Sequence, residues 1–124
     1  MSRVSPEQRW LRTKAEDAFQ SELLDVARRL GWLAFHDHDA RRDNDLAGVD
    51  KGFPDTVLCH PRQRRLIIAE LKRETGRVSS EQLVWLGALM QIPAIEVYSW
   101  KPRDWDSILE ILQHPTAEVR DGRH

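Results

Sequence analysis

Apolar residues recur at three- and four-residue spacing from residue 13 to residue 30. This spacing is typical of one amphipathic helix whose apolar face covers a sheet. Ser5-Pro6 and Thr13 are both suitable helix starts, so the helix either begins at Thr13 or breaks there. Gly31 marks its predicted end. The apolar face would carry Ala15, Phe19, Leu23, Val26, Ala27 and Leu30.

Four short apolar segments are predicted to be strands. The first, residues 32–36, directly follows the helix-ending glycine. The next two flank the turn-favouring residues 61–65, which include Pro61, so they are predicted to pair as a β-hairpin. Asp55 would open the first hairpin strand, and residues 66–72 would form the second. The fourth strand, residues 94–100, alternates apolar and polar positions.

Two further helices are predicted in the second half of the chain. Ser79 begins one of them, with Gln82 placed to complete a capping box, and Ile92-Pro93 ends it. The other runs from Asp104 to Leu112. The predicted buried positions are Leu83, Leu86, Leu89 and Met90 in the first of these helices and Trp105, Ile108, Leu109 and Leu112 in the second.

The predicted order of elements is α-β-β-β-α-β-α, which is an α/β fold. An antiparallel hairpin and a last strand reached by a helical crossover predict a four-stranded mixed sheet flanked by helices. At 124 residues the chain is one domain, with a core of about residues 13–113 and a loose tail at residues 114–124. Residues 37–51 lack periodicity and are predicted to form a long loop, which is more often functional than idle.

The composition narrows the class of protein. Hydrophobic residues make up 40% and charged residues 31%, as is ordinary for a soluble globular domain. No segment approaches the roughly 18 apolar residues of a membrane span, and the first residues lack the apolar core of a signal peptide. A cytoplasmic protein without membrane contact is therefore expected. Cys59 is the only cysteine, which rules out an internal disulfide or a cysteine-cluster metal site.

Charge is unevenly distributed along the chain, although the formal net charge is only -1. Residues 62–77 contain six basic side chains against two acidic ones. Residues 36–50 contain five aspartates against two arginines. This pattern predicts a basic surface for a polyanion beside an acidic pocket suited to a divalent cation.

Asp55, Glu70 and Lys72 are the strongest candidates for chemistry. Side chains alternate along a strand, so Glu70 and Lys72 would share one face, opposite Asp55 on the neighbouring strand. Two converging carboxylates offer hard oxygen ligands to Mg²⁺, and a nearby lysine can orient an attacking water. The alternative is an ordinary surface ion pair with Asp55 as a turn residue.

Pro54-Asp55 followed by Glu70-Leu71-Lys72 resembles the PD-(D/E)xK nuclease signature. From about Glu16 to Leu112 the chain resembles the small stand-alone form of the virus-type replication-repair nuclease (VRR-NUC) family. The resemblance implies a restriction-endonuclease-like core, a divalent-metal-dependent DNA phosphodiesterase, and a homodimer that acts on branched or junction DNA. It rests also on Gly52-Phe53, Ala69, Gly76, Gln82, Trp85, Val97-Tyr98, Trp100-Lys101-Pro102 and Trp105.

The family's functional residues can be carried over to matching positions. By this resemblance Asp55 and Glu70 would hold Mg²⁺, or Mn²⁺, together with the backbone carbonyl of Leu71. Lys72 would act on the attacking water, and Gln82 matches a glutamine that the family keeps near the site.

The family also has an acidic residue in its first helix. Glu16 is its best match, because it borders the sheet-facing side, and Glu22 is the runner-up. Simpler roles exist for two of these residues, since Glu16 could complete a capping box at Thr13 and Gln82 the box at Ser79.

Other polar residues are weaker candidates. His36 and His38 form a histidine pair, but a zinc site needs a third spaced ligand, so a polar strand end is the simpler interpretation. The tryptophans fit core positions better than base-stacking ones. The candidates for contact with the DNA backbone are Arg41, Arg42, Lys51, Arg73 and Arg77. Each of them could instead be an ordinary solvated surface charge.

Two other functions stay open at this point. One is a nucleic-acid-binding or assembly subunit that kept the fold without turnover, although the complete acid-acid-lysine set argues against it. The other is a sequence-specific restriction nuclease, for which 124 residues leave little room.

Overall fold

The computed structural model describes residues 6–37 and 52–113, with side chains described from residue 17 onward. The predicted order of helices and strands is confirmed. The elements are α1 (Pro6–Arg29), β1 (Leu33–His36), β2 (Thr56–His60), β3 (Arg65–Leu71), α2 (Ser80–Leu89), β4 (Ile95–Trp100), the short 3-10 helix η3 (Pro102–Asp104) and α3 (Trp105–Gln113).

The four strands form one mixed sheet in the order β1-β2-β3-β4. Strands β1 and β2 are antiparallel, β2 and β3 form the predicted antiparallel hairpin, and β3 and β4 are parallel. Helix α2 makes the crossover between the two parallel strands, as such a connection requires. The four-stranded mixed sheet predicted from the sequence is therefore confirmed.

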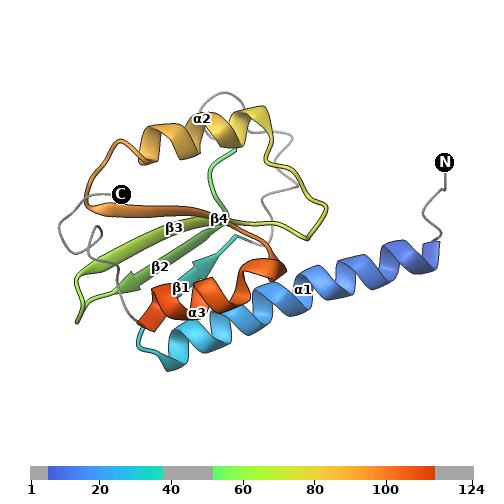
Figure 1. Ribbon diagram of the computed structural model, residues 1–124, viewed down its shortest axis with the longest axis horizontal. Helices are drawn as coiled ribbons and strands as arrows, with labels where there is room; N and C mark the ends of the chain where they lie inside the picture. The colour runs from blue at the N-terminus through green and yellow to red at the C-terminus, as the bar shows by residue number, and fades with distance from the viewer. Residues whose placement is uncertain (1–5, 38–51, 114–124) are drawn as a thin grey trace.

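Helices cover both faces of this sheet (Figure 1). Helices α1 and α3 lie against one face, and α2 lies against the other. Strand alternation sends Ala69 and Leu71 toward α1 and α3, while Glu70 between them points to the face of α2. The main core thus lies between the sheet and the helix pair, and contains Phe19, Leu23, Leu24, Ala27, Trp32, Leu58, Ile67, Ala69, Leu71, Trp100, Ile108 and Leu112.

Helix α1 runs from Pro6 to Arg29 without interruption, so the prediction that it begins or breaks at Thr13 was wrong. Gly31 follows its end with a φ of 99°, a conformation that other residues adopt only with strain. The imidazole of His60 lies against this glycine, and its Nε2 donates to the carbonyl of Leu30 at 3.0 Å. The end of α1 is thereby attached to the hairpin.

The predicted buried face of α2 was wrong at two positions. Leu83 is 60% exposed and Met90 is 54% exposed, whereas Leu86 is buried and Leu89 half-buried. The helix is apolar on almost every side, so periodicity in the sequence could not identify the face that contacts the sheet. One apolar row of α2 packs on the sheet and another faces outward.

A buried ion pair joins β3 to β4 at the end of β3 away from Glu70. Arg65 donates to both carboxylate oxygens of Glu96 at 2.7 Å, and its guanidinium lies 4.9 Å from the Trp32 ring centroid. The hydroxyl of Tyr98 donates to Glu96 at 3.2 Å, and burial, with the Glu96 charge, raises the pKa of Tyr98 to about 12. These contacts help fix which residues of the parallel strands pair.

Within residues 6–37 and 52–113, no helix is long and apolar enough to cross a membrane. The predicted loop of residues 37–51 lies outside this described part except for Asp37, and so does the predicted tail.

Candidate active site

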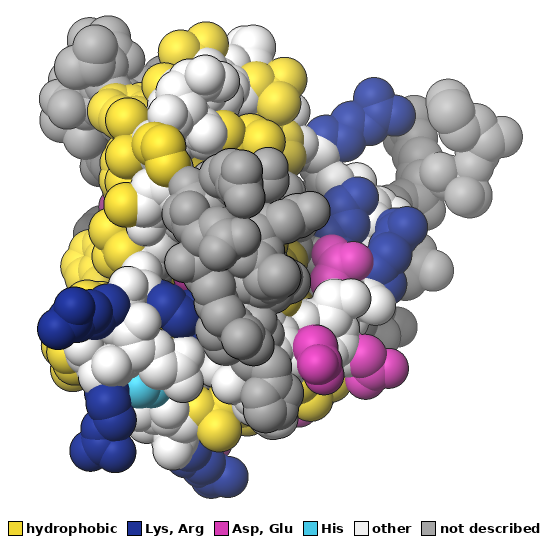
Figure 2. Space-filling model, turned by 60° about the vertical axis from the view of Figure 1, so that its left-hand side comes forward, with side chains coloured by type: hydrophobic (Ala, Val, Ile, Leu, Met, Phe, Trp, Pro, Cys, Tyr) yellow, Lys and Arg dark blue, Asp and Glu magenta, His cyan; other side chains and the backbone are white. Residues whose placement is uncertain are grey.

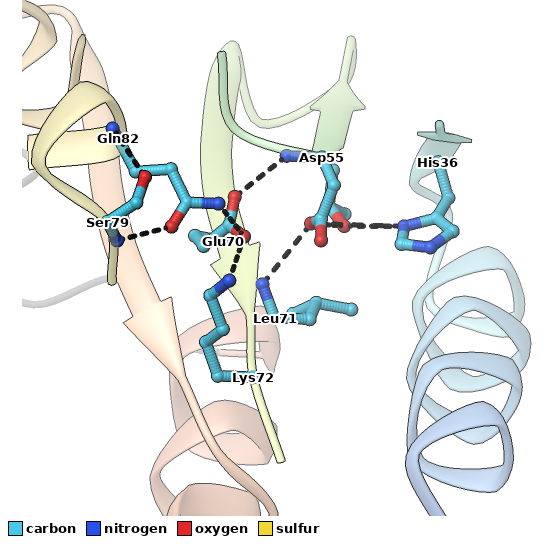
Figure 3. A network of polar contacts seen from close by, with 8 residues as sticks. His36, Asp55, Glu70, Leu71, Lys72, Ser79 and Gln82 are labelled. Carbon is cyan, nitrogen blue, oxygen red and sulfur yellow. Dashed lines mark hydrogen bonds and ion pairs between the residues drawn. The ribbon is translucent and has the colours of Figure 1, made fainter. Parts of the chain in front are cut away.

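The hairpin register brings the two candidate carboxylates together. Thr56 pairs with Ala69, so Asp55, just before β2, lies beside Glu70 near the end of β3. The backbone N–H of Asp55 donates to Glu70 Oε1 at 3.3 Å. Figure 3 shows Asp55 between Glu70 on one side and His36 on the other. The convergence of Asp55 and Glu70 is therefore a consequence of strand pairing.

Hydrogen bonds hold one oxygen of Asp55. Its Oδ1 accepts the backbone N–H of Leu71 at 3.2 Å and the hydroxyl of Thr56 at 2.8 Å. The side chain is 14% exposed. With Oδ1 engaged by two donors, Oδ2 is the oxygen left to take a ligand.

Glu70 has two partners on its other oxygen. Its Oε2 lies 3.2 Å from Lys72 Nζ and accepts the side-chain N–H of Gln82 at 2.6 Å. The Lys72 side chain is 22% exposed, against 4% for Glu70, so the lysine reaches solvent while the carboxylate does not. The amine and the two carboxylates thus form one compact cluster.

Gln82 completes the capping box of α2 and also contacts Glu70. Its backbone N–H donates to Ser79 Oγ at 3.1 Å, and its side-chain oxygen accepts the Ser79 N–H at 2.8 Å. This is the predicted capping box. Because the amide oxygen is used in the cap, the amide nitrogen is directed at Glu70.

The start of α2 also fixes the segment before Asp55. Gly52 has a φ of 90°, and a Cβ at this position would lie 2.6 Å from the Glu81 carbonyl carbon. The rings of Phe53 and Trp85 meet edge to face with centroids 4.9 Å apart. The chain can therefore approach the helix this closely only with glycine at position 52. The sequence did not predict these contacts.

The pKa values of the Asp55 and Glu70 carboxyl groups are both raised. Burial raises the pKa of Asp55 to about 6, although hydrogen bonds from Thr56 and Leu71 oppose the rise. Burial and then the Asp55 charge raise the pKa of Glu70 to about 7, against the opposing charge of Lys72. Two adjacent carboxylates are thus costly to ionise together in this environment.

The donors at this site suit a hard divalent cation. Mg²⁺ prefers oxygen ligands and usually takes one or two carboxylates while keeping several waters. Asp55 and Glu70 supply such a pair, and a cation between them would relieve their repulsion. In the part of the chain that the structure describes, no three His, Cys, Asp or Glu side chains come together as a richer ligand set, which leaves the zinc interpretation without support there.

The remaining candidates are the acids of α1, His38 and the residues proposed to contact DNA. Glu16 is in α1, but its side chain is outside the described part, and Glu22 is exposed on the same helix. Arg73 and Arg77 are exposed on the segment that follows Lys72. His38, Arg41, Arg42 and Lys51 lie outside the described residues.

His36 also contacts the site, which was not predicted from the sequence. His36 Nδ1 lies 3.0 Å from Thr56 Oγ1 and 3.9 Å from Asp55 Oδ1. His36 and Thr56 are directly opposite each other in the β1–β2 pair. Only the pairing of the first strand with the hairpin could have indicated this contact, and local patterns do not reveal strand order.

Comparison with known proteins gives a family match. The family model described as the VRR-NUC domain matches residues 2–99, which is most of the chain. The matched range includes both carboxylates, Lys72 and Gln82. No curated protein and no solved structure gave a significant match.

The raised pKa values predict a pH-dependent stability of the metal-free protein. In the folded state both values lie above the ordinary 3.8 and 4.5, so the folded protein holds these protons more tightly than the unfolded chain. Their stabilisation is therefore full below about pH 4 and is lost as pH rises through 6 and 7. Between pH 5 and pH 8, urea unfolding should show a loss of roughly 1–3 kcal/mol from this pair.

Glu70→Gln isolates the contribution of the pair from that of other groups. The variant should lose less stability than the wild type over the same pH range, and Mg²⁺ should stabilise the wild type at pH 8. Equal pH dependence in the two proteins would show that the carboxylates do not interact as described.

The close contact between Gly52 and α2 predicts that replacing this glycine with alanine lowers the stability of the protein. Gly52→Ala combines backbone strain with a collision against Glu81, so it should destabilise the protein by about 1–3 kcal/mol. It should also weaken binding of Mg²⁺, because Asp55 is displaced. Thermal unfolding and calorimetry measure the two effects.

Gly87→Ala is the matched control. This glycine lies within α2, and a Cβ there would meet nothing within 4 Å. Alanine is favoured over glycine in a helix by about 1 kcal/mol, so at concentrations where both proteins are monomeric this variant should be as stable as the wild type or more so. A loss of stability as large as that of Gly52→Ala would contradict the proposed packing.

Proposed function

Because the chain belongs to the VRR-NUC family, a family of nucleases, we propose that it is a divalent-metal-dependent DNA endonuclease of the PD-(D/E)xK type. The observation that carries the proposal is the buried pair of Asp55 and Glu70 with Lys72 Nζ 3.2 Å from Glu70. Two carboxylates with pKa values raised to about 6 and 7 are unfavourable neighbours unless a cation joins them.

Asp55 and Glu70 would hold Mg²⁺, or Mn²⁺, with the backbone carbonyl of Leu71 as a further oxygen ligand. When bound, such an ion polarises a phosphoryl oxygen and lowers the pKa of a bound water. Asp55 would contribute Oδ2, since Oδ1 is engaged by Thr56 and Leu71.

Lys72 would orient the attacking water and offset negative charge that develops on the phosphate. Its ion pair with Glu70 keeps the amine at the site before DNA arrives. Gln82 acts by holding Glu70 in place through the 2.6 Å hydrogen bond, and Glu16 is the proposed acid from α1.

DNA would contact the exposed arginines that follow the catalytic lysine. Arg73 and Arg77 are both exposed there, and phosphate contacts of this kind set affinity and register rather than sequence preference. The proposed additional contacts are Arg41, Arg42 and Lys51. We propose branched or junction DNA as the substrate, in a role such as DNA repair.

A homodimer would supply the surface that one small domain lacks for such a substrate. The outward row of α2 supports this proposal: Leu83 is 60% and Val84 is 72% exposed, and Met90 lies two turns along the same side. A Cβ at Gly87, which lies between them, would meet nothing within 4 Å. Figure 2 shows hydrophobic side chains gathered at the top of the molecule, where α2 lies. Small and apolar residues in one row allow two helices to pack closely.

A catalytically silent nucleic-acid-binding subunit is the alternative function. Such a protein has no need to keep two carboxylates with raised pKa values adjacent to each other. Binding of Mg²⁺ at Asp55 therefore separates the two proposals.

Removing a metal ligand or the lysine should abolish most cleavage. With Mg²⁺ or Mn²⁺, the wild type should cut at least one DNA in a panel of linear, flapped and four-way substrates. Asp55→Asn and Lys72→Ala should each lower the rate by on the order of 100- to 1,000-fold while DNA binding changes little.

Asp25→Asn is the control, because Asp25 is exposed on α1 and pairs only weakly with Arg29. It should cleave at the wild-type rate. If the wild-type protein binds every substrate and cuts none, the enzyme proposal is wrong and the binding subunit is correct.

A charge on the outward row of α2 should prevent dimerisation. Light scattering should give about twice the 14.5 kDa monomer mass for the wild type and the monomer mass for Val84→Lys. Ser107→Lys, which adds the same charge at an exposed position on α3, should stay dimeric. A wild-type protein that is monomeric at every concentration would refute the proposed dimer.

A further inference from the structure

A directed chain of hydrogen bonds connects β1 to the proposed metal ligand Asp55. The hydroxyl of Thr56 donates to Asp55 Oδ1 at 2.8 Å. A hydroxyl has one proton, so at its contact with His36 Nδ1, 3.0 Å away, Thr56 must accept. His36 therefore carries its proton on Nδ1 and donates to Thr56, which donates to Asp55.

Both residues are held in place by the sheet. His36 ends β1 and Thr56 begins β2, and the two are paired in the antiparallel register. Thr56 is 0% exposed, and the His36 side chain is 4% exposed. Water therefore has little access to replace either hydrogen bond. His36 and Thr56, which form these hydrogen bonds, lie on strands rather than on a loop, so their positions are well fixed.

The hydrogen bonds from His36 through Thr56 determine how Asp55 presents its carboxylate. Thr56 and the Leu71 N–H approach the same oxygen, Oδ1, from different strands. Two donors on one oxygen fix the rotation of the carboxylate group. Within the described residues Oδ2 accepts no hydrogen bond, which leaves it to face a cation.

We propose that Thr56 and His36 are positioning residues that orient Asp55 for a divalent cation. This inference rests on the proposed function, because it concerns the same metal site. Groups that hydrogen-bond to a metal ligand typically change metal affinity by about 10- to 100-fold when removed. The effect requires no contact between the cation and either residue.

The competing explanation is that these hydrogen bonds only attach the edge strand β1 to β2. In that case their loss would lower stability without a specific effect on metal binding. The two explanations differ in metal affinity measured on folded protein, and in whether a conservative variant restores it.

Isothermal titration calorimetry with MgCl₂ and with MnCl₂, on the full chain without DNA, tests the role of Thr56. Thr56→Val keeps the shape but removes the hydroxyl, and should weaken metal binding by about 10- to 100-fold. Thr56→Ser keeps the hydroxyl and should bind within a few-fold of the wild type. Cleavage by Thr56→Val should recover as the metal concentration is raised.

A second pair of variants tests His36, in case Thr56→Val does not fold. His36→Asn keeps an N–H at the δ position and should retain most of the metal affinity, whereas His36→Leu should lose it. Unfolding in urea without metal, measured on all four variants, shows whether stability alone accounts for the differences.

The outcomes separate failure of this inference from failure of the proposed function. If the wild type binds the metal and both Thr56→Val and His36→Leu bind it within twofold of the wild type, the positioning role is wrong and the metal site stands. If the wild type binds neither ion, the metal site itself is wrong, and the positioning role is wrong with it.

Discussion

The proximity of two carboxylates, Asp55 and Glu70, is the constraint on which the rest of the site depends. The hairpin register sets it, since Thr56 pairs with Ala69. Burial raises the pKa of both groups, to about 6 and 7, so the protein keeps an unfavourable pair at one end of its sheet. In a domain with a single small core, such a pair is expected where function needs it. In the function we propose, a divalent cation held by both carboxylates would relieve their repulsion.

Three elements besides the hairpin set the geometry of this pair. Strand β1 brings His36 to Thr56, and thereby fixes one oxygen of Asp55. The first turn of α2 brings Gln82 to Glu70 and packs against Gly52. Strand β4 accepts the backbone N–H of Lys72 through the carbonyl of Trp100 at 2.8 Å, which holds the lysine at the end of β3. The site is therefore preorganised by secondary structure, and the chemistry proposed for it needs little rearrangement of the described residues.

Local patterns predicted most of the fold and the centre of the site. The order of elements, the hairpin and the capping box at Ser79 all follow from short-range rules, and the spacing of Asp55, Glu70 and Lys72 follows from the hairpin. The missed features depend on contacts between elements distant in sequence. The buried face of α2 was wrong because that helix is apolar on almost every side, and the link from His36 to Asp55 required the strand order. The catalytic roles themselves stay predictions.

The number of protons released when metal binds tests most directly whether Asp55 and Glu70 together hold a divalent cation. At pH 6.5, pKa values of about 6 and 7 mean that the pair of carboxyl groups together carries about one proton, which a cation must displace. Calorimetric titration of the wild type with MgCl₂ in two buffers of different ionisation enthalpy measures this release. We expect about one proton to be released per cation by the wild type, and much less by Glu70→Gln. Binding without proton release, or equal release in the two proteins, would contradict this expectation.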